Sequence, residues 1–261
     1  MPAHDLALLI DAARMAGRVA TSFAGDTAQR WDKADNAGPV TAADLAVNDM
    51  LSATLRLARP DYGWLSEETE DSAARLSSDA VFILDPIDGT RSFIEGSRTW
   101  AHSLAIAHHG KITAAVVYLP LRDMLYTAAV GRGAHLNGQP LEIKNDIPLI
   151  GAQILSTKAN MADSLWPNGV PEFERHHRPS LAYRLGLVGE AKFDGMLTLR
   201  PSWEWDIAAG ALIVTEAGGT ISDKTGAPLR FNNPEPLLNG IVAGGTQMHA
   251  DTIAALNHSA N

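Results

Sequence analysis

The chain has 261 residues, a formal charge of −9 at pH 7 and no cysteine. This length supports a large core in one or two domains, and the lack of cysteine excludes disulfides, a thiolate nucleophile and Cys-ligated zinc. The acidic excess argues against a nucleic-acid polymer as partner, because phosphate neutralisation needs surplus Lys and Arg. Neither a signal peptide nor a membrane span is indicated, so we expect a cytoplasmic protein without a membrane partner.

Apolar spacing in the N-terminal segment predicts two helices joined by a loop. Apolar residues recur at three- and four-residue steps over Leu6–Ala20, which predicts an amphipathic helix. Residues 25–40 are polar and punctuated by Gly and Pro, and we expect a loop there. A second helix is expected over Ala42–Ala58, with Thr41 as its N-cap.

The next stretch predicts an antiparallel meander. Strands are expected at Tyr62–Leu65, Val81–Leu84, Ser103–His108, Ile112–Leu119 and Met124–Ala129. Asn137-Gly138 predicts a two-residue hairpin whose returning strand runs through Leu141–Ile143.

After Asn145 the pattern becomes mixed. Strands are expected at Ala152–Ser156, Phe193–Leu199 and Ile241–Ala243, and a surface loop at 167–179. Helices are expected at Ser180–Glu190, at Ile207–Ala217 and, capped by Thr246, to about Leu256. We therefore divide the chain into a helix-plus-antiparallel-sheet half, residues 1–145, and a mixed α/β half, residues 146–261.

The sharpest chemical motif is Asp85-Pro86-Ile87-Asp88-Gly89-Thr90, which follows the apolar run Val81–Leu84. A buried strand would deliver Asp85 at its end, and a turn at the Pro and Gly positions would point Asp88 back toward it. Two crowded carboxylates repel each other, and a hard divalent cation such as Mg²⁺ removes that cost. Backbone N–H groups at Gly89-Thr90 would bind phosphate if a helical turn follows.

Three further positions place acidic residues at segment boundaries. They are Glu67-Glu68 after the strand at Tyr62–Leu65, Asp206 at the start of an apolar helix, and Asp44 in the first turn of the second helix. Each alone has a structural explanation, because an Asp at a helix N-terminus is usually a cap and a Glu pair is usually solvated.

In their order and spacing, these motifs resemble the inositol monophosphatase family over nearly the whole chain. The resemblance rests on Glu67-Glu68, the 85–90 motif and Trp205-Asp206-Ile207-Ala208-Ala209-Gly210, and extends to Lys33, Val40-Thr41, Asp44 and Glu216-Ala217-Gly218-Gly219. It implies an α/β (α+β) fold, a layered α/β/α/β/α sandwich with an antiparallel N-terminal sheet and a mixed C-terminal sheet. It also implies Mg²⁺-dependent hydrolysis of a small phosphorylated metabolite and a homodimer.

Position by position, the resemblance implies a site of two or three Mg²⁺ ions. The implied metal ligands are Glu67, Asp85, Asp88, Asp206 and the main-chain carbonyl of Ile87, while Asp44 and Thr90 are implied to orient and activate the attacking water, and Gly89 and Thr90 to contact phosphate. Four carboxylates carry −4, which two Mg²⁺ would neutralise, and a third would offset a phosphate dianion. We expect direct attack by metal-bound water. Ser66 stands where many members have Gly, which leaves the ligand Glu67 in place.

The substrate is indicated by the residues around the motifs. The chain reads Arg91-Ser92-Phe93-Ile94 after the Asp-Gly-Thr turn, and Met196–Ser202 contains no acid that would bind an inositol hydroxyl. Both features resemble the bacterial 3'(2'),5'-bisphosphate nucleotidase branch, and Arg91, Arg184 and Arg200 are candidates for a second phosphate. The opposing interpretation leaves these arginines on the solvated surface.

Other functions stay open at this point. Inositol 1-phosphate and histidinol phosphate are alternative substrates, and a non-catalytic regulatory relative would keep the fold with a broken ligand set. A zinc hydrolase is disfavoured by oxygen-only ligands. His176-His177 are expected in a solvated loop rather than as a metal pair.

Overall fold

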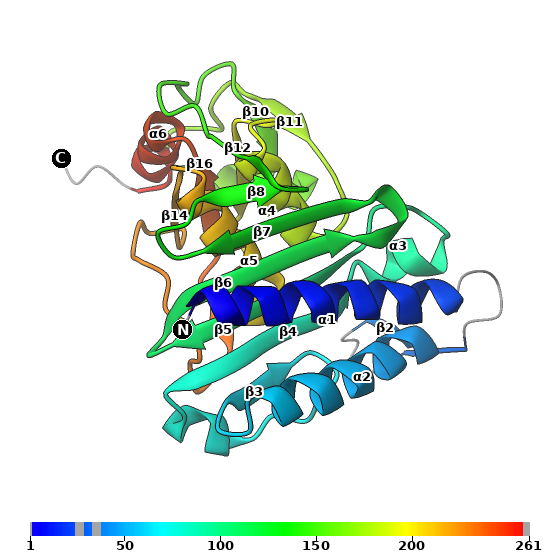
Figure 1. Ribbon diagram of the computed structural model, residues 1–261. Coiled ribbons are helices and arrows are strands. Elements are labelled where there is room, and N and C mark those ends of the chain that lie inside the picture. Colours follow the sequence, from blue (N-terminus) through cyan, green and yellow to red (C-terminus); the bar gives the residue numbers. More distant parts are fainter. Residues whose placement is uncertain (1, 24–28, 33–37, 258–261) are drawn as a thin grey trace.

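The computed structural model describes residues 2–23, 29–32 and 38–257 and arranges them in alternating layers of helix and sheet (Figure 1). The first layer is the pair α1 (Pro2–Ser22) and α2 (Ala42–Ala58). Helix α2 begins at Ala42 with Thr41 as its N-cap, as predicted, because the Thr41 hydroxyl accepts the backbone N–H of Asp44 while the Asp44 carboxylate accepts the N–H of Thr41.

These helices cover one face of a seven-stranded sheet, ordered β3-β4-β5-β6-β7-β8-β9. Its strands are β3 (Gly63–Ser66), β4 (Ala80–Asp88), β5 (Ala101–His108), β6 (Lys111–Leu119), β7 (Met124–Ala129), β8 (Ala134–Leu136) and β9 (Gln139–Pro140), with the short helix α3 (Thr90–Ile94) after β4. Alternation along β4 sends Phe82 and Leu84 to α1 and α2, and Val81 and Ile83 to the opposite side.

The opposite side packs on α4 (Leu181–Gly189) and α5 (Glu204–Glu216), which form the central layer. Beyond them lies a five-stranded sheet, and α6 (Thr246–Leu256) covers its outer face. This sheet has the order β11-β10-β12-β16-β14, with β10 (Gln153–Leu155), β11 (Glu174–His176), β12 (Gly195–Thr198), β14 (Thr220–Ser222) and β16 (Ile241–Gly244). Helix α5 is apolar around most of its circumference because sheets lie on both sides.

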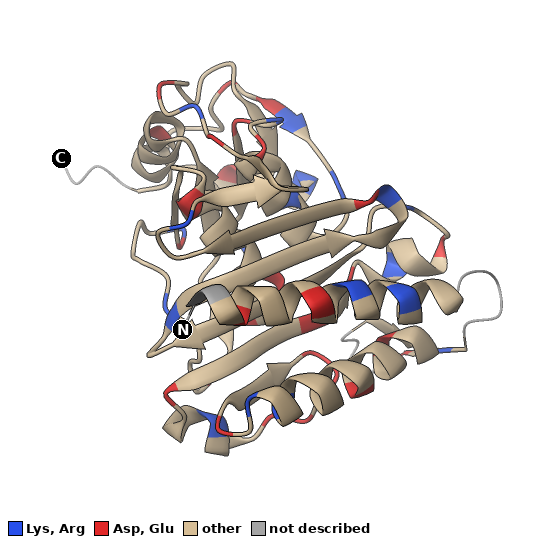
Figure 2. Cartoon of the chain, in the orientation of Figure 1, with Lys and Arg blue, Asp and Glu red and all other residues tan. Residues whose placement is uncertain are grey.

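Two small ladders and several turns complete the described chain. Strands β1 (Arg30–Asp32) and β2 (Pro39–Thr41) pair, as do β13 (Ser202–Trp203) and β15 (Leu237–Leu238). Single 3-10 turns lie at Ala73–Ser77, Pro120–Arg122, Lys158–Met161 and Asp163–Leu165. Acidic and basic residues are interspersed on α1 and α2 (Figure 2), and none of the described helices is long and apolar enough for a membrane crossing.

The predicted fold class and layered sandwich are confirmed, with corrections in the N-terminal half. The predicted loop at 25–40 contains β1 and β2, because the exposed and polar β1 has no apolar alternation to mark it. The first sheet is not wholly antiparallel, since β3 pairs parallel with β4. The expected strand at Leu141–Ile143 is wrong: β9 ends at Pro140, and Ile143 donates its backbone N–H to the carbonyl of Ala217 after α5 instead of to a neighbouring strand.

The C-terminal half has two further corrections. Strand β11 lies inside the loop predicted at 167–179 and pairs parallel with β10 at a sheet edge. Thr246 is the first residue of α6 rather than its cap, and Gly245 is the N-cap. The division near residue 145 stays a prediction, and one apolar cluster contains residues from both sides of it, such as Ile83 and Ala243.

Candidate active site

The acidic motif is built at the end of β4, where the strand bulges. Pairing with β5 shifts register between Asp85 and Asp88, so β4 runs to Asp88 instead of ending before Asp85. The Asp85 carboxylate accepts the backbone N–H of Ile87 at 2.9 Å, and His102 donates from Nδ1 to the carbonyl of Pro86. Burial lowers the pKa of His102 to about 4, so its ring stays neutral and holds the bulge. The bulge thus turns both carboxylates toward one side.

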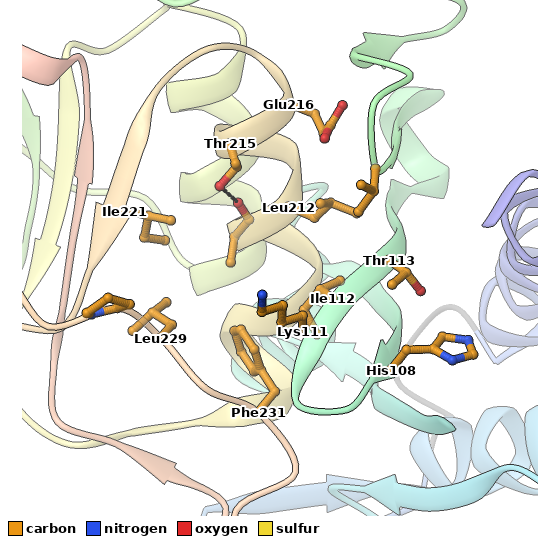
Figure 3. A pocket seen from close by; sticks show the side chains of 13 residues that line it. His108, Lys111, Ile112, Thr113, Leu212, Thr215, Glu216, Ile221, Leu229 and Phe231 are labelled. Atoms are coloured by element: carbon orange, nitrogen blue, oxygen red, sulfur yellow. Dashed lines mark hydrogen bonds between the residues drawn. The ribbon is translucent and has the colours of Figure 1, made fainter. Parts of the chain in front are cut away.

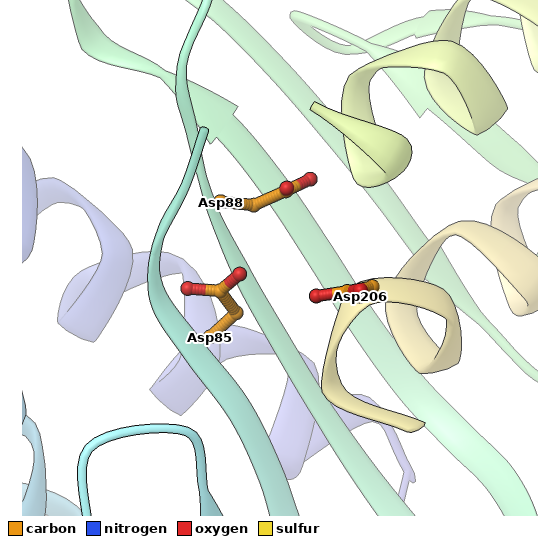
Figure 4. Close-up of side chains that lie close together, drawn as sticks. All are labelled: Asp85, Asp88 and Asp206. Atoms are coloured by element: carbon orange, nitrogen blue, oxygen red, sulfur yellow. The ribbon is translucent and has the colours of Figure 1, made fainter. Parts of the chain in front are cut away.

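Asp206, in the first turn of α5, completes a cluster of three carboxylates (Figure 4). One oxygen each of Asp85, Asp88 and Asp206 lies within 4.8 Å of the others. Glu67 directly follows β3, whose parallel register places Ser66 beside Leu84 and so brings Glu67 to Asp85. The two side chains share a hydrogen bond. All four predicted carboxylates therefore lie together, and Glu67, Asp85, Asp88 and Asp206 are called the carboxylate cluster below.

The carboxylates raise one another's proton affinity. Burial, followed by the negative charges of Glu67, Asp88 and Asp206, raises the pKa of Asp85 well above its usual range. Burial also raises the pKa of Asp88 to about 6, although hydrogen bonds from Ser180 and Ala182 oppose the shift. Such repulsion is relieved by a multivalent cation, and an all-oxygen donor set suits Mg²⁺. The residues present fit the metal that the sequence predicts.

The N-terminus of α4 fixes the orientation of Asp88. Its Oδ2 accepts the Ser180 hydroxyl at 2.6 Å and the Ala182 backbone N–H at 2.7 Å. Both bonds go to one oxygen, so Oδ1 can bind a cation. Gly89 has φ of 100°, a conformation that disfavours any side chain, and it lets the backbone turn from β4 into α3.

Asp44 and Thr90 form a hydrogen-bonded pair. Thr41 donates its N–H and its hydroxyl to Oδ2 of Asp44, at 2.8 and 2.5 Å. The Thr90 hydroxyl lies 3.2 Å from Asp44 Oδ1 and 3.2 Å from the carbonyl oxygen of Ile87. Burial is the main cause that raises the pKa of Asp44. The arrangement holds a hydroxyl and a carboxylate together next to the predicted carbonyl ligand.

A cavity of about 530 Å³ opens over these groups. Glu67, Asp88, Gly89, Thr90 and Asp206 line it, and so do all three predicted arginines, Arg91, Arg184 and Arg200. Among its described lining residues, the acids all belong to the carboxylate cluster. The lining of the cavity therefore combines the acidic residues of the carboxylate cluster with basic arginine side chains.

Comparison with known proteins assigns the chain to a family. The model of the inositol monophosphatase family matches residues 2–260. The chain belongs to this family. An inositol-1-monophosphatase of Mesorhizobium japonicum and the Nus factor SuhB of Escherichia coli K12 are each 32% identical to it, over 93% of this chain and 92% of the relative. A crystal structure described as 2'AMP-bound SaIMPase-II superposes with a TM-score of 0.81 at 26% identity, covering 96% of this chain and 92% of that one.

Membership of the inositol monophosphatase family makes the chain a phosphatase that hydrolyses phosphoric monoesters. The family acts on small phosphorylated substrates and is in general Mg²⁺-dependent, in keeping with the carboxylate cluster. Lys33, part of the family resemblance, lies outside the described residues.

The structure corrects two interpretations that were drawn from the sequence. Arg184 is not on the solvated surface: it is buried, its Nε donates to the carbonyl of Arg178, and its Nη2 lies 3.0 Å from His177 Nε2. His176 lies on β11 against the Phe193 ring rather than in a solvated loop. Arg91 and Arg200 are exposed within the cavity lining.

Sequence reasoning missed two features of this family member's site. The Ser180 hydroxyl donates a hydrogen bond to Asp88, a contact that the expected place of Ser180 at a helix start did not indicate. Trp203 and Trp205 stack and line the cavity, and the alternation of two tryptophans around Glu204 was the signal that could have revealed them.

A second cavity, of about 450 Å³, lies between the β5–β6 hairpin, α5 and the segment at 228–231 (Figure 3). Its lining is mainly apolar, with Leu212, Leu229 and Phe231 among the side chains. Glu216 is on its rim, but both of its carboxylate oxygens accept backbone N–H groups at 131–133. The described lining residues of this cavity include no cluster of acids for phosphate chemistry.

Proposed function

We propose that this phosphatase hydrolyses the 3'-phosphate of adenosine 3',5'-bisphosphate. The observation that carries the proposal is the charge of the cavity wall: Arg91, Arg184 and Arg200 line it, and the acids among its described lining residues are those of the carboxylate cluster. A second phosphate on the substrate would meet guanidinium groups, which bind phosphate oxygens in pairs. The 2'AMP described in SaIMPase-II supports room for a nucleotide in this fold.

We propose Glu67, Asp85, Asp88, Asp206 and the carbonyl of Ile87 as the groups that hold two or three Mg²⁺. Bound Mg²⁺ would neutralise the phosphate and favour the nucleophilic form of water. The chain itself positions the phosphate with the N–H groups of Gly89 and Thr90 at the start of α3. Two hydrogen bonds from the N-terminus of α4 hold one carboxylate oxygen of the buried Asp88 in place and so fix the orientation of this side chain.

Asp44 and Thr90 are proposed to orient the attacking water. Thr90 donates its hydroxyl hydrogen to Asp44 Oδ1, so the Thr90 oxygen can accept a hydrogen from water. The water oxygen then forms a bond to phosphorus while the bond to the 3'-oxygen breaks. The leaving oxygen takes up a proton, and inorganic phosphate and adenosine 5'-monophosphate result.

Replacing Thr90 with Ala tests this pair. We expect kcat to fall about 10²-fold, the lower end of general-base contributions, because Asp44 remains in place. Thr90→Ser keeps the hydroxyl and should retain most of the wild-type kcat. Steady-state rates at saturating Mg²⁺ and substrate measure the effect, and thermal unfolding checks the fold. A wild-type rate in the Ala variant would restrict Thr90 to a role in the turn.

The substrate proposal is tested by measuring kcat/KM for each phosphate ester separately under the same conditions. At saturating Mg²⁺, kcat/KM for adenosine 3',5'-bisphosphate should exceed that for inositol 1-phosphate and histidinol phosphate. The expected reason is that the described lining of the cavity is rich in arginine and has no acid outside the carboxylate cluster, so it offers no acceptor for an inositol hydroxyl. Phosphate release measures all three. An equal or higher value for inositol 1-phosphate would overturn the choice of substrate.

Inositol 1-phosphate is the second candidate, favoured by the name of the Mesorhizobium relative. A purely regulatory role is disfavoured, because the carboxylates, Asp44 and Thr90 are all present and lie together. The homodimer and the cytoplasmic location stay predictions that rest on the sequence.

A further inference from the structure

Two tryptophan rings stack at the entrance to α5. The ring centroids of Trp203 and Trp205 are 4.7 Å apart and their planes differ by 9°. Both side chains line the cavity that contains the carboxylate cluster. Trp205 is half-buried, whereas Trp203 is 42% exposed. One face of the Trp203 ring is therefore covered by Trp205, and the ring still presents a large aromatic surface in the substrate cavity.

The backbone beneath the rings is held from both sides. Strand β13 pairs Trp203 with Leu237 of β15, and the carbonyl of Trp205 accepts the hydroxyl of Ser103 at 2.8 Å. Glu204, between the two tryptophans, is fully buried, and its carboxylate accepts backbone N–H groups of Asn232 and Asn233 at 2.6 and 2.9 Å. The stack is thus prearranged, and a ligand that adds to it would order little of the protein.

The apolar packing of the fold does not account for the exposed Trp203 ring. Trp205 packs against the main hydrophobic core, but Trp203 is not part of the described apolar clusters. A large aromatic surface inside a cavity favours a flat π system, since stacked aromatic rings attract each other beyond the area they bury. Base stacking on an aromatic side chain contributes about 1–3 kcal/mol per base and accepts any base.

The positive charge of an arginine near Trp203 favours a nucleotide over an uncharged aromatic ligand. Arg200 lies three residues before Trp203, is exposed and lines the same cavity. Guanidinium groups suit phosphate, the tryptophan face suits a planar base, and the carboxylate cluster suits the reacting phosphate. We propose that Trp203, backed by Trp205, is the stacking platform for the nucleobase of the substrate and so determines specificity for nucleotides. This inference rests on the proposed function, because it assumes a nucleoside bisphosphate in the site.

The test compares Trp203→Ala with Trp203→Phe on two substrates. The first is adenosine 3',5'-bisphosphate, and the second is methyl ribofuranoside 3,5-bisphosphate, which has both phosphates but no base. For the nucleotide, we expect the Ala variant to lose about 10- to 100-fold in kcat/KM, mostly through KM, which corresponds to the strength of base stacking. The Phe variant should recover most of the loss. For the abasic substrate, both variants should match wild type.

A matched control is Trp31→Ala, because Trp31 is 47% exposed but is not among the residues that line the cavity. Its kcat/KM for the nucleotide should stay close to wild type. A second readout is calorimetric binding of adenosine 5'-monophosphate, which requires no turnover and should weaken about 10-fold or more in Trp203→Ala alone.

The outcomes separate the two proposals. If Trp203→Ala leaves nucleotide turnover and monophosphate binding unchanged while wild type still prefers the bisphosphate over inositol 1-phosphate, the stacking platform is wrong and the proposed function stands. If wild type prefers inositol 1-phosphate, the proposed function is wrong, and monophosphate binding then decides the platform. An equal loss on the abasic substrate would make Trp203 a structural residue and would also overturn the platform.

Discussion

Removing divalent cations with EDTA is expected to abolish phosphatase activity, and adding Mg²⁺ back is expected to restore it. Asp85, Asp88 and Asp206 lie within 4.8 Å of one another, and Glu67 shares a hydrogen bond with Asp85. Without a cation, this cluster repels a phosphate dianion. Hard oxygen ligands bind Mg²⁺ reversibly, so a chelator should remove it without unfolding the chain.

The same experiment has a readout that does not depend on catalysis. A ligand that binds only the folded state stabilises it by about 2.7 kcal/mol when present at 100 times its Kd. Mg²⁺ should therefore raise the Tm of the chelated protein, and Asp85→Asn should reduce that increase. Calorimetric scans with and without Mg²⁺ measure it. Full turnover in a sample shown by elemental analysis to be metal-free would contradict the proposed site.

Local sequence signals predicted the elements that carry the site. The strand before Asp85 was recognisable because β4 is buried on both faces and is therefore continuously apolar. Helix α2 was recognisable because Thr41, directly before it, is a typical N-cap residue. Neither feature depends on distant parts of the chain, so spacing and residue type were sufficient. The metal and water roles of these residues remain proposals.

Contacts that form only when loops and elements pack together were not predictable in the same way. Arg184 is buried because the carbonyl of Arg178 and the ring of His177 receive its guanidinium, and an isolated Arg on a helix looks exposed. The parallel β3–β4 pair brings Glu67 to Asp85. Its two strands are separated by a 3-10 turn, and hairpin signals predict only antiparallel pairs. Ser180 binds Asp88 across 92 positions of the sequence. Each of these contacts depends on tertiary packing.

Replacement of Asp88 with Asn is expected to lower kcat at least about 10²-fold, the scale reported for loss of one electrostatic group at a transition state. The substitution keeps the shape of the side chain but offers only one oxygen. If that oxygen retains the bonds from Ser180 and Ala182, the amide NH₂ faces the cation site and cannot coordinate. If the amide is reversed, its NH₂ meets the N–H of Ala182, and two donors then oppose each other.

Kinetics and stability together distinguish these effects for Asp88→Asn. The loss in kcat should be accompanied by a higher Mg²⁺ concentration for half-maximal activity, while circular dichroism shows a folded protein. The control is Asp79→Asn, the same chemical change on a side chain that is 88% exposed, and it should stay within about twofold of wild type because surface substitutions have small effects. An Asp88 variant that is unfolded would assign the residue to anchoring α4. One with full activity and an unchanged Mg²⁺ requirement would remove Asp88 from the ligand set, because the oxygen lost would then have had no part in binding the cation.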